Sequence, residues 1–262
     1  MEIKSKYFQS NMETMNKRIL AYLHQLEPPI DIKLPGKNTQ WLYPLKNLET
    51  CRCMEEFFSK YYSDTNERIL VLGINPGRFG SGITDSDGLT TLQGVNTFIA
   101  LGVPLTDPIR LKTACNIDSN FPLKPELSSK FIYDYFFNQY SMNDFYKKFF
   151  IGAVCPLGLE SNGRNMNYYD NKTLMNNLLE DFIPDNIEKQ INLGCSKKVA
   201  ICLGEGTNYS ILHKLNEKYH FFEKILKVSH PRYIMQYKRQ SIKDYVQQYI
   251  DTCQLAEKIV SK

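Results

Sequence analysis

The sequence predicts an α/β protein, a three-layer α/β/α sandwich around a central, mostly parallel sheet of four strands. Two observations carry this prediction. Four short apolar runs rich in β-branched residues, at 68–73, 149–154, 198–203 and 224–228, are typical of buried strands. The segments between them place apolar residues at helical spacing, and strands that alternate with helices form a parallel sheet covered on both faces.

The elements follow in order from the N-terminus. An amphipathic helix is expected first, because Met12, Met15, Ile19, Leu20, Leu23 and Leu26 recur at helical spacing before Pro28 and Pro29 end it. After a polar stretch with the only tryptophan, Trp41, helices are expected over 49–62, 127–140, 171–193 with an interruption at Pro184, 207–219 and 241–259. We interpret residues 1–48 as an N-terminal helical extension and residues 49–262 as one α/β domain.

Composition narrows the class of protein. The chain has 262 residues, 42% of them hydrophobic and 13% aromatic, which suits one sizeable core without a linker. The first residues lack the apolar region of a leader, and no run approaches the roughly 18 apolar residues of a membrane span. Seven cysteines, an odd number, do not suit a secreted disulfide framework. We therefore expect a monomeric cytoplasmic protein without a membrane partner.

The most informative segment is the glycine-rich loop 73–82, which follows the first strand directly. It is not a Walker phosphate loop, because Ile83 stands where that motif needs lysine. It is not a dinucleotide fingerprint either, because an Asp-Ser-Asp-Gly turn follows where a helix should begin. No Cys-x-x-Cys occurs, so we expect neither a metal site nor a cofactor.

The segments after the predicted strands should converge, because ligand sites of parallel sheets lie beyond the carboxyl ends of the strands. These segments are 75–79, 155–158, 204–206 and 229–233. Net charge is only +4, but the stretch from Lys224 to Lys243 carries six Lys or Arg, one His and no acid. That stretch is a candidate phosphate-contacting surface; the alternative is an ordinary solvated basic face.

Four motifs in register now resemble one family. Gly-Ile-Asn-Pro-Gly-Arg-Phe-Gly at 73–80, Gly-Val-Pro at 102–104, Cys-Pro-Leu at 155–157 with Gly-Arg-Asn at 163–165, and His-Pro-Arg-Tyr at 230–233 are similar to motifs of the single-strand-selective monofunctional uracil-DNA glycosylases. The likeness runs from about residue 45 to residue 250. It implies a uracil-DNA glycosylase fold and hydrolysis of an N-glycosidic bond in DNA.

The resemblance gives Asn75 and His230 the catalytic roles. Breaking the bond yields an oxocarbenium-like sugar and an anionic base, so the chemistry needs a positioned water and a hydrogen-bond donor to the departing base. Asn75 matches the first role and His230 the second. In the alternative interpretation Asn75 only stabilises its own turn, His230 is structural and Phe79 belongs to the core.

DNA contacts are expected around the basic loop 230–239. A nucleotide must leave the stack to be cut, so residues must fill the gap and hold the backbone. Tyr233, Ile234 and Met235 are the expected wedge between bases. The expected phosphate contacts are Arg78, Arg164, Arg232, Lys238 and Arg239. No lysine lies in the motifs as an amine nucleophile, so we expect no strand cleavage.

Three departures from the family pattern fall on the base pocket. Leu105 replaces the aromatic residue after Gly-Val-Pro, and Ala153 replaces the asparagine that reads the pyrimidine edge in uracil-specific members. Residues 85–101 form an insertion between Thr84 and Gly102. The expected pocket residues are Gly73, Ile74, Pro76, Gly77, Phe79, Asp85, Asp87, Gln93, Asn96, Leu105 and Ala153.

Smaller walls and an added polar loop suggest a larger base. We therefore hypothesise that the partner is DNA with a bulky modified pyrimidine, such as a hydroxymethylated or glycosylated base of phage DNA, which would suit antiviral defence. One alternative is conventional uracil excision in DNA repair. A second is a non-catalytic protein that only binds modified DNA.

Overall fold

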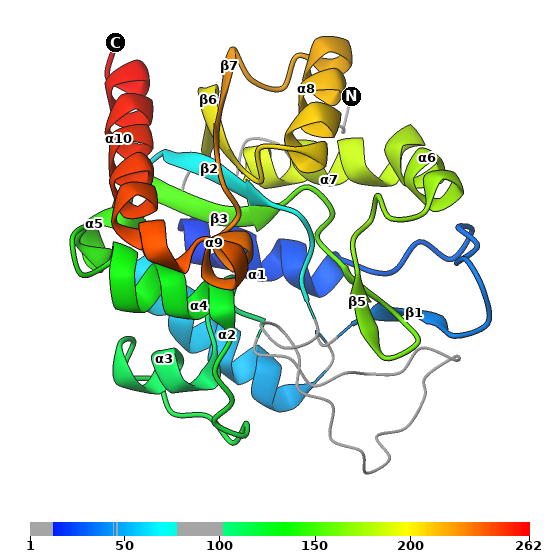
Figure 1. The fold of residues 1–262 in the computed structure, drawn as a ribbon, viewed down its shortest axis with the longest axis horizontal. Coiled ribbons are helices and arrows are strands. Elements are labelled where there is room, and N and C mark those ends of the chain that lie inside the picture. Colours follow the sequence, from blue (N-terminus) through cyan, green and yellow to red (C-terminus); the bar gives the residue numbers. More distant parts are fainter. Residues whose placement is uncertain (1–12, 44, 46, 78–101) are drawn as a thin grey trace, which may run out of the picture.

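The computed structural model describes residues 13–43, 45, 47–77 and 102–262 (Figure 1). The strands are β1 (Thr39–Leu42), β2 (Arg68–Gly73), β3 (Phe149–Ala153), β4 (Gly158–Ser161), β5 (Arg164–Met166), β6 (Cys195–Leu203) and β7 (Lys224–Val228). The helices are α1 (Met15–Gln25), α2 (Leu48–Tyr61), α3 (Pro108–Thr113), α4 (Leu127–Phe131), α5 (Met142–Lys148), α6 (Lys172–Glu180), α7 (Phe182–Asn192), α8 (Thr207–Tyr219), α9 (Pro231–Tyr237) and α10 (Ile242–Val260). A π-helical turn, η2 (Ile132–Phe136), continues α4, and a 3₁₀ turn, η3 (Arg239–Ser241), precedes α10.

The central sheet has four strands in the order β3-β2-β6-β7, and every pair is parallel. All six residues of β2 are buried, as expected for an inner strand covered on both faces. The predicted strands 68–73 and 224–228 match β2 and β7, β3 ends one residue early, and β6 begins at Cys195. The predicted fold class is confirmed.

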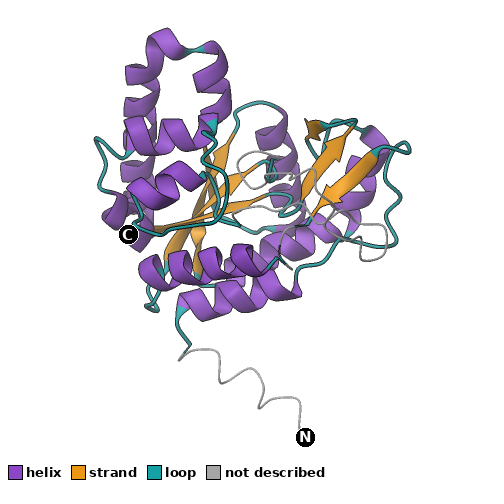
Figure 2. Cartoon of the chain, turned by 90° about the horizontal axis from the view of Figure 1, so that it is seen from below, coloured by secondary structure: helices purple, strands orange, loops and turns teal. Residues whose placement is uncertain are grey.

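Helices cover both faces of this sheet (Figures 1 and 2). The chain moves from β2 to β3 toward one edge, and from β3 through β6 to β7 toward the other. Right-handed crossovers therefore place α4 and α5 on one face and α7 and α8 on the opposite face. The rings of Phe131 and Phe136 meet Tyr249 of α10, which joins the first layer. Tyr22 of α1 donates a hydrogen bond to Asn186 of α7, so α1 adjoins the second layer.

A second, three-stranded antiparallel sheet, in the order β1-β4-β5, was not predicted. Its strands have only three or four residues, which is too short for an alternating pattern to stand out. Thr39 pairs with Ser161 across more than a hundred residues of sequence. This sheet carries the hairpin of β4 and β5 to the carboxyl end of β2.

Two helices differ from their predictions for clear reasons. The expected break in 171–193 falls at Asp181, between α6 and α7, and not at Pro184. Pro184 is the third residue of α7, where a backbone N–H has no partner inside the helix and its loss costs little. Residues 231–237, expected as a loop, form α9 with Pro231 as the first helical residue.

Arg68 shows how this core accepts a charge. Its side chain is fully buried at the start of β2, yet its guanidinium donates to the carbonyl oxygens of Tyr146 and Asn66 and to the carboxylate of Asp64. Burial of a charge is tolerated when the group is paired and hydrogen-bonded in this way. Arg68 thus ties the loop before β2 to the end of α5.

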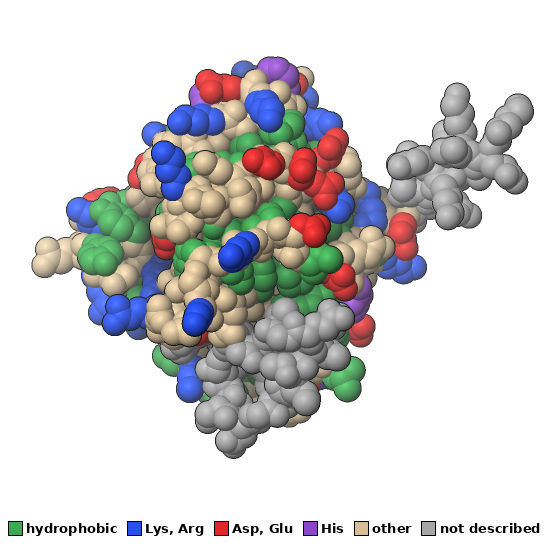
Figure 3. Space-filling view, turned by 90° about the vertical axis from the view of Figure 1, so that its right-hand side faces the viewer, with side chains coloured by type: hydrophobic (Ala, Val, Ile, Leu, Met, Phe, Trp, Pro, Cys, Tyr) green, Lys and Arg blue, Asp and Glu red, His purple; other side chains and the backbone are tan. Residues whose placement is uncertain are grey.

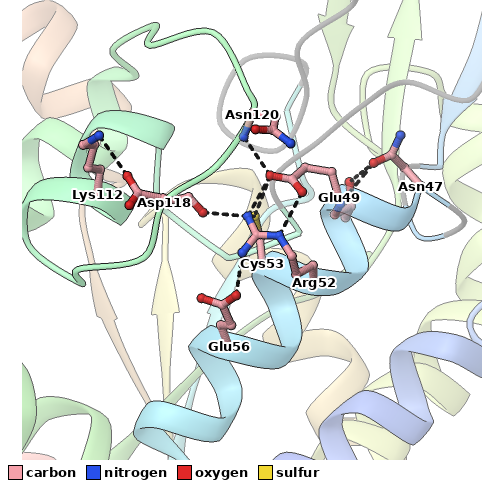
Figure 4. Close-up of polar contacts among 9 residues, drawn as sticks. Asn47, Glu49, Arg52, Cys53, Glu56, Lys112, Asp118 and Asn120 are labelled. Carbon is pink, nitrogen blue, oxygen red and sulfur yellow. Dashed lines mark hydrogen bonds and ion pairs between the residues drawn. The ribbon is translucent and has the colours of Figure 1, made fainter.

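A polar network on α2 holds the turn at residues 118–120 (Figure 4). The guanidinium of Arg52 donates to the carboxylates of Glu49 and Glu56 and to the carbonyl oxygen of Asp118. Glu49 also accepts from the backbone N–H of Asn120, and the hydrogen bond from Arg52 is the main reason that its carboxyl pKa lies below the usual value. The network joins one end of α2 to the 118–120 turn.

All seven cysteines lie in the described part of the chain as free thiols, six of them buried. No helix within the described ranges is both long and apolar enough to cross a bilayer. Among the same residues no group of three or more His, Cys, Asp or Glu side chains is placed to hold a metal ion.

Candidate active site

Asn75 and His230 line one cavity of about 740 Å³. Asn75 directly follows β2, and His230 lies two residues beyond β7, with β6 between these strands in the sheet. Carboxyl ends of parallel strands meet at one edge of a sheet, which is why residues 155 positions apart reach the same space. The same cavity is lined by the predicted residues Gly73, Ile74, Pro76, Gly77, Leu105, Ala153, Arg164, Arg232 and Tyr233. Arg78, Phe79, Asp85, Asp87, Gln93 and Asn96 lie outside the described residues.

The amide of Asn75 is held on both sides by backbone groups. Its Nδ2 donates to the carbonyl oxygens of Pro76 at 3.2 Å and Met166 at 3.1 Å, and its Oδ1 accepts from the backbone N–H of Tyr168 at 3.1 Å. These bonds use both N–H groups and one of the two lone pairs of the oxygen. The second lone pair of Oδ1 is therefore the one hydrogen-bonding position of the amide that these bonds leave unused.

The imidazole of His230 is oriented by the helix that it caps. Its Nδ1 accepts a hydrogen bond from the backbone N–H of Arg232 at 3.2 Å, which satisfies a donor in the first turn of α9. A ring nitrogen that accepts carries no proton, so in the neutral ring the proton sits on Nε2. Burial, together with the nearby guanidinium of Arg232, lowers the pKa of His230 to about 4. The site therefore holds a neutral imidazole with an Nε2–H donor at neutral pH.

The helix α9 determines which residues of the predicted DNA-contacting loop are buried and which are exposed. Ile234 and Met235, which were expected to insert between bases, are 0% and 2% exposed and so do not project from the surface in this structure. Helical geometry turns these two residues inward, where α9 packs against α4. Tyr233 and Tyr237 lie one turn apart on the outer side, 44% and 65% exposed, with ring centroids 5.5 Å apart. Tyr237 also lines the cavity and was missed, because a helix was not predicted here.

The predicted phosphate-contacting residues lie at the surface. Arg232, Lys238 and Arg239 are exposed on and just after α9, and Arg239 donates from Nε to the carbonyl oxygen of Met235. Arg164 is exposed at the start of β5, at the rim of the cavity. On the face shown in Figure 3, Lys and Arg side chains are interspersed with acidic and neutral ones and form no single patch. Of the three basic residues on and after α9, Arg232 is the one that lines the cavity.

Two cavity-lining residues, Ala153 and Leu105, have their backbones held in different ways. Gln190 of α7 clamps Ala153, because its Nε2 donates to the carbonyl oxygen of Ala153 and its Oε1 accepts from the N–H of the same residue. A Cβ at Gly152 would lie 2.0 Å from that Oε1, so glycine is required beside the clamp. Leu105 has a φ of 51°, a left-handed conformation that is unusual for leucine. Nothing in the helical pattern of 171–193 singled out Gln190.

Several wall residues were missed because they come from the predicted N-terminal extension. Tyr22, Leu23 and Leu26 at the end of α1, together with Leu42 and Leu45, line the cavity. Apolar helical periodicity gave no reason to separate these residues from ordinary packing. The N-terminal segment thus supplies part of the apolar lining of the cavity.

Glu126 is a further wall residue that sequence reasoning missed. It caps α4, because its carboxylate accepts from the backbone N–H of Ser129 at 2.8 Å and from the hydroxyl of Ser128 at 3.1 Å. Burial raises the pKa of Glu126, while these hydrogen bonds and the charge of Arg232 oppose that rise. The capping bonds explain how a carboxylate is kept in a partly buried position.

Comparisons with known proteins place this geometry in a family. Residues 59–254 match the model of the uracil DNA glycosylase superfamily. The crystal structure of wild-type Pedobacter heparinus SMUG2 is similar with a TM-score of 0.81 and 37% sequence identity, over 94% of this chain and 100% of that one. None of the curated proteins compared matches the chain. The chain therefore belongs to the uracil DNA glycosylase superfamily as a SMUG-like member and is a DNA glycosylase.

Proposed function

We propose that this glycosylase flips a modified pyrimidine out of DNA, hydrolyses its N-glycosidic bond and leaves an abasic site. The observation that carries the proposal is the shared cavity of Asn75 and a neutral His230. No described residue that lines the cavity is a lysine, which supports hydrolysis without an amine nucleophile or strand cleavage. We further propose that the enzyme acts as a monomer in the cytoplasm, where its free thiols are stable.

Asn75 is proposed to position the attacking water. The unused lone pair of Oδ1 accepts a hydrogen bond from the water, while the backbone of residues 166 and 168 prevents rotation of the amide. A neutral amide orients the water without adding a charge beside the developing oxocarbenium. The contribution is therefore one of position and orientation.

His230 is proposed to stabilise the departing base. As the bond to the sugar breaks, negative charge builds on a carbonyl oxygen of the base, and the Nε2–H of His230 donates to it. Since the ring is already neutral and anchored through Nδ1, it needs neither a proton nor reorientation during the reaction. Removing one such preorganised donor costs about 10²–10³ in rate.

The outer face of α9 is proposed to engage the DNA backbone and the bases beside the flipped nucleotide. Tyr233 and Tyr237 offer two exposed rings on which bases can stack. Arg232, Lys238 and Arg239 are exposed, and we propose that they contact phosphates. Stacking would offset part of the few kcal/mol that extrusion of a nucleotide costs, so both groups favour the flipped state.

The finer proposal concerns the base. The cavity of about 740 Å³ falls within the 300–1,000 Å³ of pockets that bury drug-sized molecules, and a pyrimidine ring is smaller than such molecules. Ala153 and Leu105 both line it, so neither the amide nor the ring of uracil-specific members occupies those positions. These features support a bulkier pyrimidine, such as a hydroxymethylated or glycosylated base of phage DNA, and a role in antiviral defence.

An excision assay on matched DNAs tests the proposal. Oligonucleotides with one uracil, one 5-hydroxymethylcytosine or one glucosylated 5-hydroxymethylcytosine are incubated with the protein, and alkali then cleaves each abasic site. We expect faster excision of a bulky base than of uracil, and we expect Ala153→Asn to lower excision of the bulky base more than that of uracil. Excision of uracil alone would establish conventional repair chemistry. Binding without excision, unchanged in Asn75→Ala, would indicate a reader of modified DNA.

A further inference from the structure

We infer that Tyr168 and Asn208 form a buried pair that positions the amide of Asn75 for the reaction. The inference rests on the proposed role of Asn75 and extends it to residues that do not touch the substrate. Tyr168 is 0% exposed and Asn208 is 2% exposed, and neither was singled out by the sequence.

The first step is the contact between Asn75 and the segment after β5. Apart from the bond to its own turn, the amide is held by two backbone groups, the carbonyl oxygen of Met166, which is the last residue of β5, and the N–H of Tyr168 in the segment that follows. Because the backbone offers an acceptor at Met166 and a donor at Tyr168, the amide of Asn75 can satisfy both only with Nδ2 toward Met166 and Oδ1 toward Tyr168. If this segment moves, the free lone pair of Oδ1 turns away from the cavity.

The second step is the anchor of that segment. The hydroxyl of Tyr168 donates to Oδ1 of Asn208 at 2.9 Å. The Nδ2 of Asn208 in turn donates to the carbonyl oxygens of Leu203 at 3.1 Å and Gly73 at 3.4 Å, which are the last residues of β6 and β2. The segment is therefore attached to the same strand end from which Asn75 projects.

The third step is the rigidity of this link. Tyr168 lies within a turn that is closed by two hydrogen bonds, since the N–H of Asp170 donates to the carbonyl oxygen of Asn167 at 3.0 Å and the N–H of Asn167 donates to the carboxylate of Asp170 at 2.8 Å. Burial raises the pKa of Tyr168, so its hydroxyl stays protonated and keeps donating. Without that donor, Oδ1 of Asn208 becomes a buried acceptor lacking its partner, an arrangement that native structures rarely tolerate.

The test is the single-turnover excision rate of Tyr168→Phe, which removes one hydroxyl and keeps the ring. The probe is an oligonucleotide with whichever of uracil, 5-hydroxymethylcytosine or its glucosylated form the unaltered protein cuts fastest. We expect the rate at saturating enzyme to fall about 5- to 30-fold, as for a loss of one to two kcal/mol, while the enzyme concentration for half-maximal rate stays the same. Tyr169→Phe is the matched control, because no hydrogen bond of its hydroxyl is found among the described residues.

A double-mutant cycle separates positioning from a general loss of structure. In an Asn75→Ala background, Tyr168→Phe should leave the residual rate unchanged, because its effect passes through the amide that is already absent. Equal losses in both backgrounds, or no loss in either, would overturn the inference. If Asn75→Ala itself keeps full activity, the proposed role of Asn75 fails instead. Thermal melts of all variants confirm that each is folded at the assay temperature.

Discussion

The neutral state of His230 makes a quantitative prediction about pH. Burial and the charge of Arg232 lower the pKa of His230 from 6.5 to about 4, a difference that corresponds to about 3 kcal/mol in favour of the neutral ring. At pH 7 about one molecule in a thousand is then protonated at this position. We expect the excision rate to show no change with a midpoint near 6.5, and to fall through protonation of His230 only as the pH approaches 4.

The same shift affects stability, with a definite sign. Between pH 6.5 and 4 the unfolded chain binds a proton at this histidine that the folded chain does not, so the free energy of unfolding decreases as the pH falls through this window. The contribution is fully present above pH 6.5 and is lost below about pH 4. Glutamine does not titrate, so in His230→Gln the decrease in the free energy of unfolding between pH 6.5 and 4 should be smaller by up to about 3 kcal/mol.

Two measurements check this reasoning. Nitrogen-15 NMR of labelled histidine gives the midpoint and the tautomer of His230, whose signal is the one missing from His230→Gln. Urea unfolding of the unaltered protein and of His230→Gln is measured at several pH values between 4 and 7. All other groups titrate in both proteins, so the difference in their pH dependence gives the part of the free energy of unfolding that comes from protonation of His230. A midpoint near 6.5, a proton on Nδ1, or identical pH dependence in the two proteins would refute the argument.

Three further predictions concern the site and its support. Gly158→Ala should destabilise the protein by about 1–3 kcal/mol in urea unfolding, because its methyl group would lie 2.6 Å from the backbone oxygen of Pro76. Gly77→Ala should cost less, since the nearest described group to its methyl is the side-chain amide of Asn165 at 2.9 Å, and equal costs would contradict this view. Tyr237→Ala should weaken binding of single-stranded DNA by about 1–3 kcal/mol in a fluorescence titration, whereas Leu255→Ala, exposed on α10, should not. Arg68→Ala should lower the free energy of unfolding by about 3–5 kcal/mol, because it leaves buried carbonyl groups without their donor, whereas Arg52→Ala at a half-exposed pair should cost about 1 kcal/mol or less.

Much of the fold could be predicted because each strand of the central sheet contains a recognisable run of apolar residues. In the run 68–73, the residues from Ile69 to Leu72 are all apolar and glycine follows them, and in 224–228 three apolar residues precede a polar segment. A buried parallel strand needs no partner-specific pattern, since both of its faces are apolar. The sheet β1-β4-β5 escaped prediction because its short strands are defined by pairing across the chain, which no local window contains.

The cavity, too, has features that the sequence predicted and features that it did not. Strand-end rules and motif spacing predicted that Asn75 and His230 would meet, and the structure places both on one cavity. Helix formation at 231–237 decided the rest of that loop, since a helix turns Ile234 and Met235 inward and leaves Tyr233 and Tyr237 outside. A sequence of seven residues that begins with His-Pro does not show by itself which of its faces will be covered.

The sequence by itself determined the class of fold and the strand ends at which polar chemistry is presented, because both depend on local patterns of apolar and polar residues. The two residues proposed to perform the chemistry came from the resemblance of its motifs to those of a known family. Only the tertiary structure decided which lone pair of Asn75 is free, which nitrogen of His230 carries the proton, and that α1 lines the cavity. Those properties arise from groups that are distant in the chain and adjacent in space, and no local pattern records such contacts.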